Sequence, residues 1–240
     1  MTESMLTTIK GKLVVSCQAL EQEPLHGAQI MARMALAAQQ GGAAAIRANG
    51  LADVAAVRRQ VALPVIAIIK RDYPDSEVFI TATVREIDEL MAAQPPMIAM
   101  DATDRPRPGG SSLAQQVAYC RRHYPQLLLM ADIASVAQAR EAEHLGFDVI
   151  GTTLYGYTDA SRGRTLAEHD FVFLREVLAA VSRPVIAEGN VLTPAMAARC
   201  MQLGCHAVVV GGAITRPQQI TARFVSAMET GNDARAGNED

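Results

Sequence analysis

Aromatic residues are scarce in this chain of 240 residues, where they make up 4% of the composition and tryptophan is absent. This scarcity argues against stacking platforms for nucleic-acid bases and against an aromatic belt at a membrane surface. The chain also lacks a strongly basic stretch, and its 22 Lys and Arg side chains are outnumbered by 25 Asp and Glu side chains. The formal net charge of −3 gives little electrostatic support for general nucleic-acid binding.

Cysteine pairs and long hydrophobic runs are also missing. The four cysteines, at positions 17, 120, 200 and 205, show no CxxC spacing, so neither a zinc site nor a disulfide framework is indicated. The apolar runs are only as long as strands, and the first ten residues lack the apolar segment of a signal peptide. Half of the residues are hydrophobic and a fifth are charged. We therefore expect a soluble globular protein of the cytoplasm.

Eight short apolar runs recur along the chain and alternate with longer amphipathic segments. Runs of Val, Ile, Leu and Ala of this length predict strands that are buried on both faces, as in parallel sheets covered by helices. The predicted strands are 13–17, 43–47, 65–69, 97–101, 127–131, 148–152, 185–189 and 207–211. The remaining segments predict eight helices, at 27–40, 51–60, 84–93, 111–123, 134–145, 168–181, 194–203 and 217–229.

Eight strand–helix units in one uninterrupted series favour a closed (β/α)8 TIM barrel over an open doubly wound sheet. An open sheet more often has about five or six strands and a glycine-rich turn after the first strand. Here SCQALEQEP follows the first strand, without a GxGxxG motif. We predict one (β/α)8 barrel domain over residues 1–229, with the active site at the carboxyl ends of the strands. Residues 230–240 are predicted to form a polar, disordered tail.

Polar and charged residues gather where the predicted strands end, which is where the functional residues of such barrels lie. Lys70 and Glu188 stand out, because each places a single charge directly after an apolar run. Strands 3 and 7 are four apart in a ring of eight, so the two side chains should face each other across the barrel mouth. A small substrate fits between them. The alternative is an ion pair that only neutralises two partly buried charges.

A second group of residues is suited to phosphate. Strand 7 ends in EGN (188–190), and strand 8 ends in GGAITRP (211–217) before the last helix. Adjacent glycines let an anion approach backbone N–H groups closely, and barrel enzymes often bind phosphate through loops 7 and 8. Arg216 can add two charge-assisted hydrogen bonds from its guanidinium to the same anion. The alternative makes Gly211 and Gly212 a plain turn and Arg216 a surface residue.

Other features are weaker signals. The five histidines show no metal-ligand spacing, and Asp101 and Asp104 lack further ligands for a cation. The loop 154–165 is long and polar and contains two tyrosines and two glycines, which is typical of a lid.

Several of these strand-end segments together resemble the N-acetylmannosamine-6-phosphate 2-epimerase (N-acylglucosamine-6-phosphate 2-epimerase) family. The resemblance extends from about Val14 to Phe224, and Asn190 lies where that family often has arginine. The segments that carry it are SCQA (16–19), IRANG (46–50), IIKRDY (68–73), MADI (130–133), GTTLYGYT (151–158), IAEGN (186–190) and VVGGAITRP (209–217).

The resemblance implies a (β/α)8 barrel that interconverts N-acetylmannosamine 6-phosphate and N-acetylglucosamine 6-phosphate in sialic-acid catabolism, without an organic cofactor or a metal. It places the family's catalytic residues on Lys70 and Glu188. The sugar-binding residues that it implies are Gln18, Arg47 and Asp132, and the phosphate-binding residues are Gly189, Gly211, Gly212 and Arg216.

Inverting C2 of an acylamino sugar requires ring opening, removal of the proton beside the aldehyde, and reprotonation on the other face. A lysine at its reference pKa of about 10.4 is a poor base at pH 7, so burial or a cationic neighbour must lower that pKa.

Two other functions stay open: a Schiff-base aldolase that acts through Lys70 on a phosphorylated sugar, and a sensor of sugar phosphates without activity. The oligomeric state, including a homo-oligomer, also stays open.

Overall fold

Eight parallel strands close into a barrel in the computed structural model, which describes residues 4–236. The strands pair in sequence order, and the first pairs with the last to complete the ring. Their bounds are Lys12–Cys17 (β1), Ala45–Asn49 (β2), Val65–Ile68 (β3), Met97–Asp101 (β4), Leu128–Asp132 (β5), Val149–Gly151 (β6), Val185–Ala187 (β7) and Ala207–Val210 (β8). The predicted (β/α)8 barrel is confirmed.

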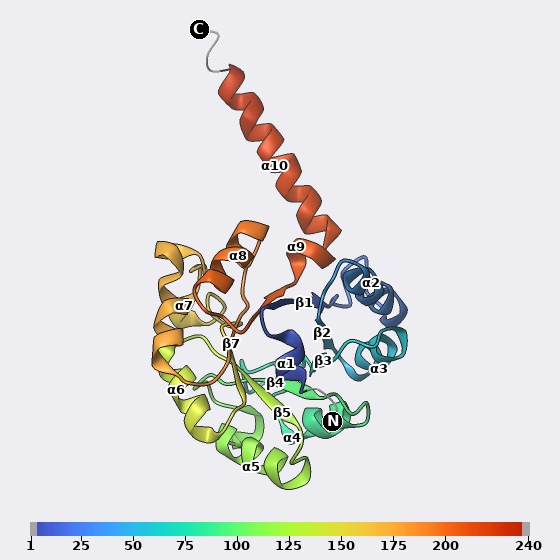
Figure 1. Cartoon of the computed structure of the whole chain (residues 1–240), viewed down its shortest axis with the longest axis vertical. Helices are drawn as coiled ribbons and strands as arrows, with labels where there is room; N and C mark the ends of the chain where they lie inside the picture. Colours follow the sequence, from blue (N-terminus) through green and yellow to red (C-terminus); the bar gives the residue numbers. More distant parts are fainter. Residues whose placement is uncertain (1–3, 237–240) are drawn as a thin grey trace.

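Most of the helices surround the barrel, and Figure 1 shows them arranged as a ring around the strands. The α-helices of the described chain are Met5–Ile9 (α1), Ala28–Gln40 (α2), Leu51–Gln60 (α3), Val84–Met91 (α4), Leu113–His123 (α5), Val136–Leu145 (α6), Glu168–Ala180 (α7), Pro194–Gln202 (α8), Gly212–Thr215 (α9) and Pro217–Ala236 (α10). The helices α2 to α8 lie close to their predicted bounds, whereas the short helices α1 and α9 were not predicted. Between residues 4 and 236, no helix has the length and apolar character to span a membrane.

The barrel interior is filled by apolar side chains, including Ile66, Met97 and Met130. Met5 and Ile9 of α1 join the same cluster, which closes the amino-terminal end of the barrel. The opposite faces of the strands pack against the surrounding helices in a larger cluster. Because both strand faces are buried, the strands consist of continuous apolar runs, as predicted. The polar strand ends are therefore confined to the other mouth of the barrel.

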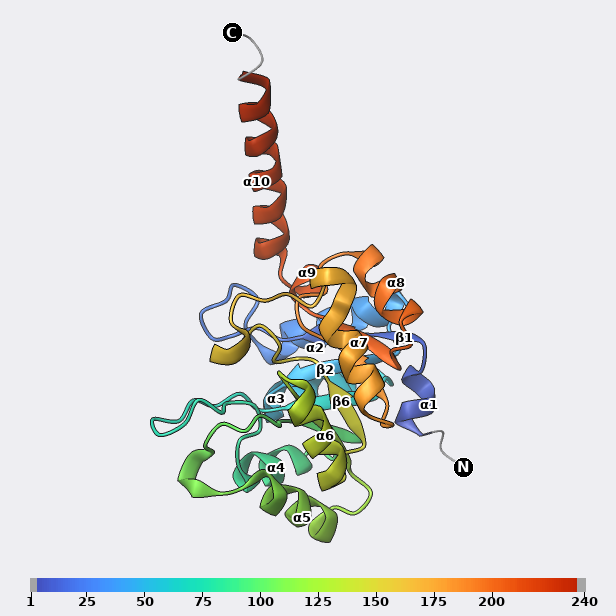
Figure 2. The ribbon, with the colours of Figure 1, turned by 90° about the vertical axis from the view of Figure 1, so that its left-hand side faces the viewer.

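The loop between β3 and α4 folds back on itself as a narrow hairpin that projects from the barrel (Figure 2). Its base is a bridge between Lys70 and Ile80. The fully buried carboxylate of Glu86 accepts hydrogen bonds from the Thr83 amide at 2.8 Å and the Tyr73 hydroxyl at 2.7 Å, and it pairs with Arg71. Burial alone would raise the pKa of Glu86, but these hydrogen bonds hold it below its usual value. The ionised carboxylate thus anchors the hairpin beside Lys70.

The helix α10 points away from the barrel instead of packing against it (Figures 1 and 2). It leaves large apolar side chains in solvent, with Phe224 68% exposed and Met228 69% exposed. The predicted end at Glu229 is too early, because residues 230–236, expected to be disordered, continue the helix. No proline interrupts this stretch, and Gly231 costs only about 1 kcal/mol relative to alanine. The rest of the predicted tail, 237–240, lies outside the described residues.

Candidate active site

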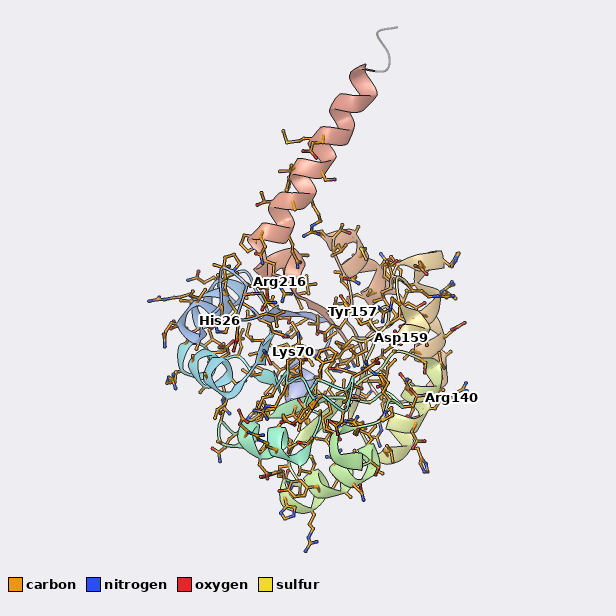
Figure 3. All side chains as sticks on the ribbon, turned by 180° about the vertical axis from the view of Figure 1, so that it is seen from behind. His26, Lys70, Arg140, Tyr157, Asp159 and Arg216 are labelled. Atoms are coloured by element: carbon orange, nitrogen blue, oxygen red, sulfur yellow. The ribbon has the colours of Figure 1, made fainter. Side chains whose placement is uncertain are left out.

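A cavity of about 300 Å³ opens at the carboxyl ends of the strands, where the polar residues were predicted to gather. Lys70 lies near the centre of the ring of helices, and Arg216 lies at the base of α10 (Figure 3). Seven of the nine predicted site residues line this cavity: Gln18, Lys70, Glu188, Gly189, Gly211, Gly212 and Arg216. The other two, Arg47 and Asp132, are almost fully buried and do not line it.

The guanidinium of Arg47 joins the ends of three strands. Its two terminal nitrogens bind the two carboxylate oxygens of Asp132, at 3.0 Å and 2.5 Å. Nη1 also donates to Oε2 of Glu188, at 2.8 Å. Arg47 is 1% exposed and Asp132 is fully buried, so one buried cation is shared by two carboxylates. A buried cation of this kind is tolerated only when it is paired and hydrogen-bonded.

Two neighbouring threonines after β6 complete this arrangement. The Thr153 hydroxyl lies 2.6 Å from Oδ1 of Asp132 and 3.2 Å from Oε2 of Glu188, which links the two acids. The Thr152 hydroxyl donates to the carbonyl oxygen of Glu188 at 2.7 Å and accepts from the Glu188 amide at 3.0 Å. Both the backbone and the side chain of Glu188 are therefore held in place. Neither threonine was assigned a role from the sequence.

The environment of Glu188 favours its protonated form. Burial raises the pKa of this carboxyl to about 7, and the negative charge of Asp132 adds to the effect against the opposing charge of Arg47. The physical reason is that a single guanidinium cannot fully compensate two buried carboxylates. Glu188 is therefore suited to accept or donate a proton near neutral pH.

The environment of Lys70 favours its neutral form. Burial lowers the pKa of the ammonium group to about 8, with further contributions from the positive charges of Arg47 and Arg216. The backbone amide of Lys70 donates to the side chain of Asn49 at 2.8 Å. Within residues 4–236, Lys70 forms no ion pair, and Glu188 is paired with Arg47 instead. The alternative of a neutralising Lys70–Glu188 pair is therefore not what the structure contains.

Two buried polar atoms at the site lack a hydrogen-bond partner among the described residues: Oε1 of Gln18 and Nε of Arg47. The amide nitrogen of Gln18 donates to the Ser16 hydroxyl at 2.7 Å, which fixes the orientation of the carboxamide. A buried polar atom without a partner costs about 1–3 kcal/mol, and a polar ligand removes that cost. Gln18, which lines the cavity, is thus prepared for a hydroxyl or amide group of a ligand.

At the glycine-rich end of the cavity, the backbone lies open to a ligand because three residues there have no side chain. Gly189 has a φ of 112°, a conformation that favours glycine, and Gly211 and Gly212 lie on the same wall. A Cβ added to Gly212 would lie 2.3 Å from Oε1 of Gln219. Arg216 faces this end, and its guanidinium is paired with Glu23 of the loop between β1 and α2. The sequence pattern contained no signal for the contact of Glu23 with Arg216.

The loop 154–165 contributes Leu154 and Tyr157 to the cavity wall and contacts the loop that follows β7. The exposed Tyr157 lines the cavity and donates to the side chain of Asn190 at 2.9 Å (Figure 3 labels Tyr157). Asn190 has a φ of 54°, which turns the chain directly after Gly189. In the described part of the chain, no three His, Cys, Asp or Glu side chains are grouped to hold a metal ion.

The closed parallel barrel, with a lysine and a partly buried glutamate at its mouth whose pKa values are shifted toward neutrality, has the features of a (β/α)8-barrel enzyme that moves protons on a small substrate. Residues 31–230 match a family model described as "Putative N-acetylmannosamine-6-phosphate epimerase". The chain belongs to this epimerase family, which confirms the resemblance of its strand-end motifs.

Relatives match over nearly the whole chain. A protein of Enterobacter sp. (strain 638), named "Putative N-acetylmannosamine-6-phosphate 2-epimerase", is 65% identical over 98% of this chain and all of its own length. One of the same name from Lactiplantibacillus plantarum is 53% identical over 95% of this chain. The solved N-acetylmannosamine-6-phosphate 2-epimerase from Clostridium perfringens is 48% identical, with a TM-score of 0.90 over 95% of this chain and 97% of its own. A thiamine phosphate pyrophosphorylase from Pyrococcus furiosus, at 19% identity and a TM-score of 0.57, shares the fold alone.

The raised pKa of Glu188 makes stability depend on pH in a defined direction. Between its ordinary pKa of 4.5 and about 7, the folded chain holds a proton that the unfolded chain has released. Stability from this proton is therefore present below pH 4.5 and is lost as the pH rises through 7. We expect the free energy of unfolding of the wild type to fall over this range relative to Glu188→Gln. Urea unfolding of both proteins from pH 5 to 8 measures this, and a difference that does not change with pH contradicts it.

Proposed function

We propose that this enzyme inverts C2 of N-acetylmannosamine 6-phosphate to give N-acetylglucosamine 6-phosphate, as a step in the breakdown of sialic acid and other amino sugars. The observation that carries this proposal is that Lys70 and Glu188 line one cavity from strands four apart, with pKa values of about 8 and about 7. The names of the close relatives supply the substrate.

The chemistry begins with the open-chain aldehyde form of the sugar, in which the C2 proton lies beside a carbonyl group. Removing that proton gives an enolate, and returning a proton to the opposite face gives the epimer. Two groups on opposite sides of the sugar do this without turning the substrate over. Lys70 follows β3 and Glu188 follows β7, so we assign one face of C2 to each.

The protonation states fit such a two-base scheme. One direction needs ionised Glu188 as the base and the Lys70 ammonium as the acid, and the reverse direction needs neutral Lys70 and protonated Glu188. Because the environment shifts the two pKa values toward each other, these two states lie closer in free energy than they would for ordinary lysine and glutamate side chains. This convergence favours turnover in both directions near neutral pH.

The other polar groups have supporting roles in this proposal. The Gln18 carboxamide accepts a hydrogen bond from a hydroxyl or amide group of the sugar and orients it. The buried Arg47 acts through Glu188, whose carboxylate it binds. Asp132 was expected to bind sugar, but both of its oxygens bind Arg47 and it is fully buried. We therefore propose that Asp132 acts through Arg47 as a positioning residue. Thr153 holds Glu188 at the correct angle.

The glycine-rich wall takes the phosphate group in this proposal. Gly189, Gly211 and Gly212 present no side chain of their own to a phosphate, the Gln219 carboxamide lies beside Gly212, and Arg216 on the same cavity supplies a positive charge. A phosphate bound there places C2 of the sugar toward Lys70 and Glu188.

The cytoplasm is the proposed location, because all four cysteines are free thiols, as is usual in a reducing compartment.

Exchange of the C2 proton with solvent tests the proposed reaction. In D₂O, the wild type should replace the C2 proton of N-acetylmannosamine 6-phosphate with deuterium as the epimer forms, which proton NMR follows directly. Lys70→Met removes one proton carrier without adding charge, and we expect inversion to fall by at least about 10²-fold. Retention of near-normal inversion by folded Lys70→Met protein would remove Lys70 from the mechanism. Borohydride added with substrate should leave the wild type unlabelled, whereas a Schiff-base aldolase would be trapped covalently.

The variant Glu188→Gln distinguishes two bases from one. If Lys70 serves one face and Glu188 the other, this variant should still exchange the C2 proton of one epimer while failing to invert it. Parallel measurement of deuterium incorporation and epimer formation gives both rates. Inversion at a rate close to that of exchange would show that Lys70 serves both faces.

The phosphate site predicts a strong preference for the phosphorylated sugar. N-acetylmannosamine without phosphate should have a much lower kcat/KM than its 6-phosphate. Arg216→Ala should weaken binding of the phosphosugar by about 1.5–3 kcal/mol, the range for a lost charged hydrogen bond, and should reduce the preference. Steady-state kinetics with both sugars measure this effect. Equal kcat/KM values for the two sugars in the wild type would contradict the proposed site.

We also propose that the chain forms a homo-oligomer in which a second copy covers α10. An isolated helix of this length is marginal in water, and this one exposes Phe224, Val225 and Met228. Sedimentation equilibrium should therefore give a multiple of 25.6 kDa for the wild type. The double substitution of Phe224 and Met228 by Glu should shift the mass toward one chain, whereas Val84→Glu on α4 should not. A wild type that sediments as a single chain contradicts the proposal.

A further inference from the structure

Arg216 is held from outside the cavity by an acidic side chain that the catalytic scheme does not use. Glu23 binds it at two points, with Oε1 2.5 Å from Nε and Oε2 2.9 Å from Nη2. Arg216 lines the cavity, and Glu23 does not. Glu23 therefore contacts Arg216 without itself lining the cavity. This pair also ties the loop between β1 and α2 to the turn between α9 and α10.

The carboxylate of Glu23 is fully occupied. Besides the two bonds to Arg216, Oε2 accepts from the Leu20 amide at 2.7 Å, and Oε1 accepts from the side chain of Gln218 at 3.1 Å. Four donors use the hydrogen-bonding capacity of one carboxylate. The hydrogen bond from Arg216 lowers the pKa of Glu23, so the group stays ionised at neutral pH. A ligand that displaced Glu23 would have to replace all four bonds.

The geometry of the pair leaves one edge of the guanidinium unused. An arginine presents its N–H groups in a rigid planar fork, with two edges that each suit a two-point contact. Glu23 takes the Nε–Nη2 edge. In the described part of the chain, Nη1 of Arg216 forms no hydrogen bond. The Nη1–Nη2 edge is thus available for a two-point contact with a phosphate group.

We propose that Glu23 is a positioning residue for the phosphate site: it holds Arg216 by one edge of the guanidinium so that the other edge meets the phosphate of the substrate. The proposal rests on the function proposed above. The physical benefit is preorganisation, because a long arginine side chain that is already fixed loses little rotamer freedom when the phosphate binds.

Glu23 could instead compete with the phosphate for Arg216, and this role predicts the opposite change in phosphate binding. If its carboxylate occupied the place of the phosphate, removing its charge would make phosphate binding tighter. If Glu23 positions Arg216, removing its charge makes phosphate binding weaker. The sign of the change in KM therefore separates the two roles.

Four single variants test the proposal: Glu23→Gln, Glu23→Asp, Arg216→Ala and, as a matched control, Glu21→Gln. Glu21 lies two residues earlier on the same loop and is exposed, so its substitution makes the same charge change away from Arg216. The measurements are kcat and KM for N-acetylmannosamine 6-phosphate and the inhibition constant of inorganic phosphate. Glu23→Asp keeps the charge but shortens the side chain, so a loss in this variant shows that the reach of the carboxylate matters as well as its charge.

We expect both Glu23 variants to raise KM and the inhibition constant of phosphate about tenfold, the effect of one weakened charge-assisted hydrogen bond, with kcat nearly unchanged. Glu21→Gln should behave as the wild type does. In the Arg216→Ala background, Glu23→Gln should add nothing further, because the group that it positions is gone.

Three results would overturn the proposal, and they differ in what else they affect. A lower KM in Glu23→Gln would make Glu23 a competitor of the phosphate. Wild-type constants in both Glu23 variants, together with a raised KM in Arg216→Ala, would show that Arg216 needs no support, and the proposed function would stand. An unchanged KM in Arg216→Ala would remove Arg216 from the phosphate site and Glu23 with it, whereas C2 exchange in D₂O tests the reaction separately. Circular dichroism of each variant shows that the fold is retained.

Discussion

The mouth of this barrel is organised around the pairing of the Arg47 guanidinium with two carboxylates. Its guanidinium lies almost fully buried between the ends of β2, β5 and β7 and binds the carboxylates of both Asp132 and Glu188. Removing an ion from water costs several kcal/mol, so a cation in this place requires anionic partners. With two carboxylates and one cation, the cluster has an excess of negative charge that favours a proton on one acid. This raised proton affinity of Glu188 makes the site suited to proton transfer.

The same cluster acts on the lysine across the cavity. Burial, with the positive charges of Arg47 and Arg216, lowers the pKa of Lys70, while burial and Asp132 raise that of Glu188. The two pKa values converge from ordinary values that lie far apart. An acid and a base of similar strength exchange roles at little cost, which suits the proposed two-base scheme. The protonation of Lys70 and Glu188 therefore depends on the whole cluster and not on one side chain.

The barrel and the positions of its strand-end residues could be predicted from the sequence, because both follow from local patterns. Apolar runs alternate with amphipathic segments, and in a barrel every strand end faces the same mouth. Lys70, Glu188 and Gly211 were placed correctly for this reason. The helix α1 escaped prediction because five residues carry too little periodicity. The path of α10 escaped it because periodicity identifies a helix but does not indicate what it packs against.

Pairing between charges was decided only by the tertiary structure. Arg47 meets Asp132 and Glu188 across 85 and 141 positions of the chain, and Glu23 meets Arg216 across 193. Motif spacing placed all of these groups except Glu23 at the mouth, but it favoured no particular pairs among them. Closing the ring brings each strand end within reach of several others, and the depth of burial then selects which charges must be paired. The sequence therefore determined the kinds of residue at the mouth, and the closed barrel decided their partners and their pKa values.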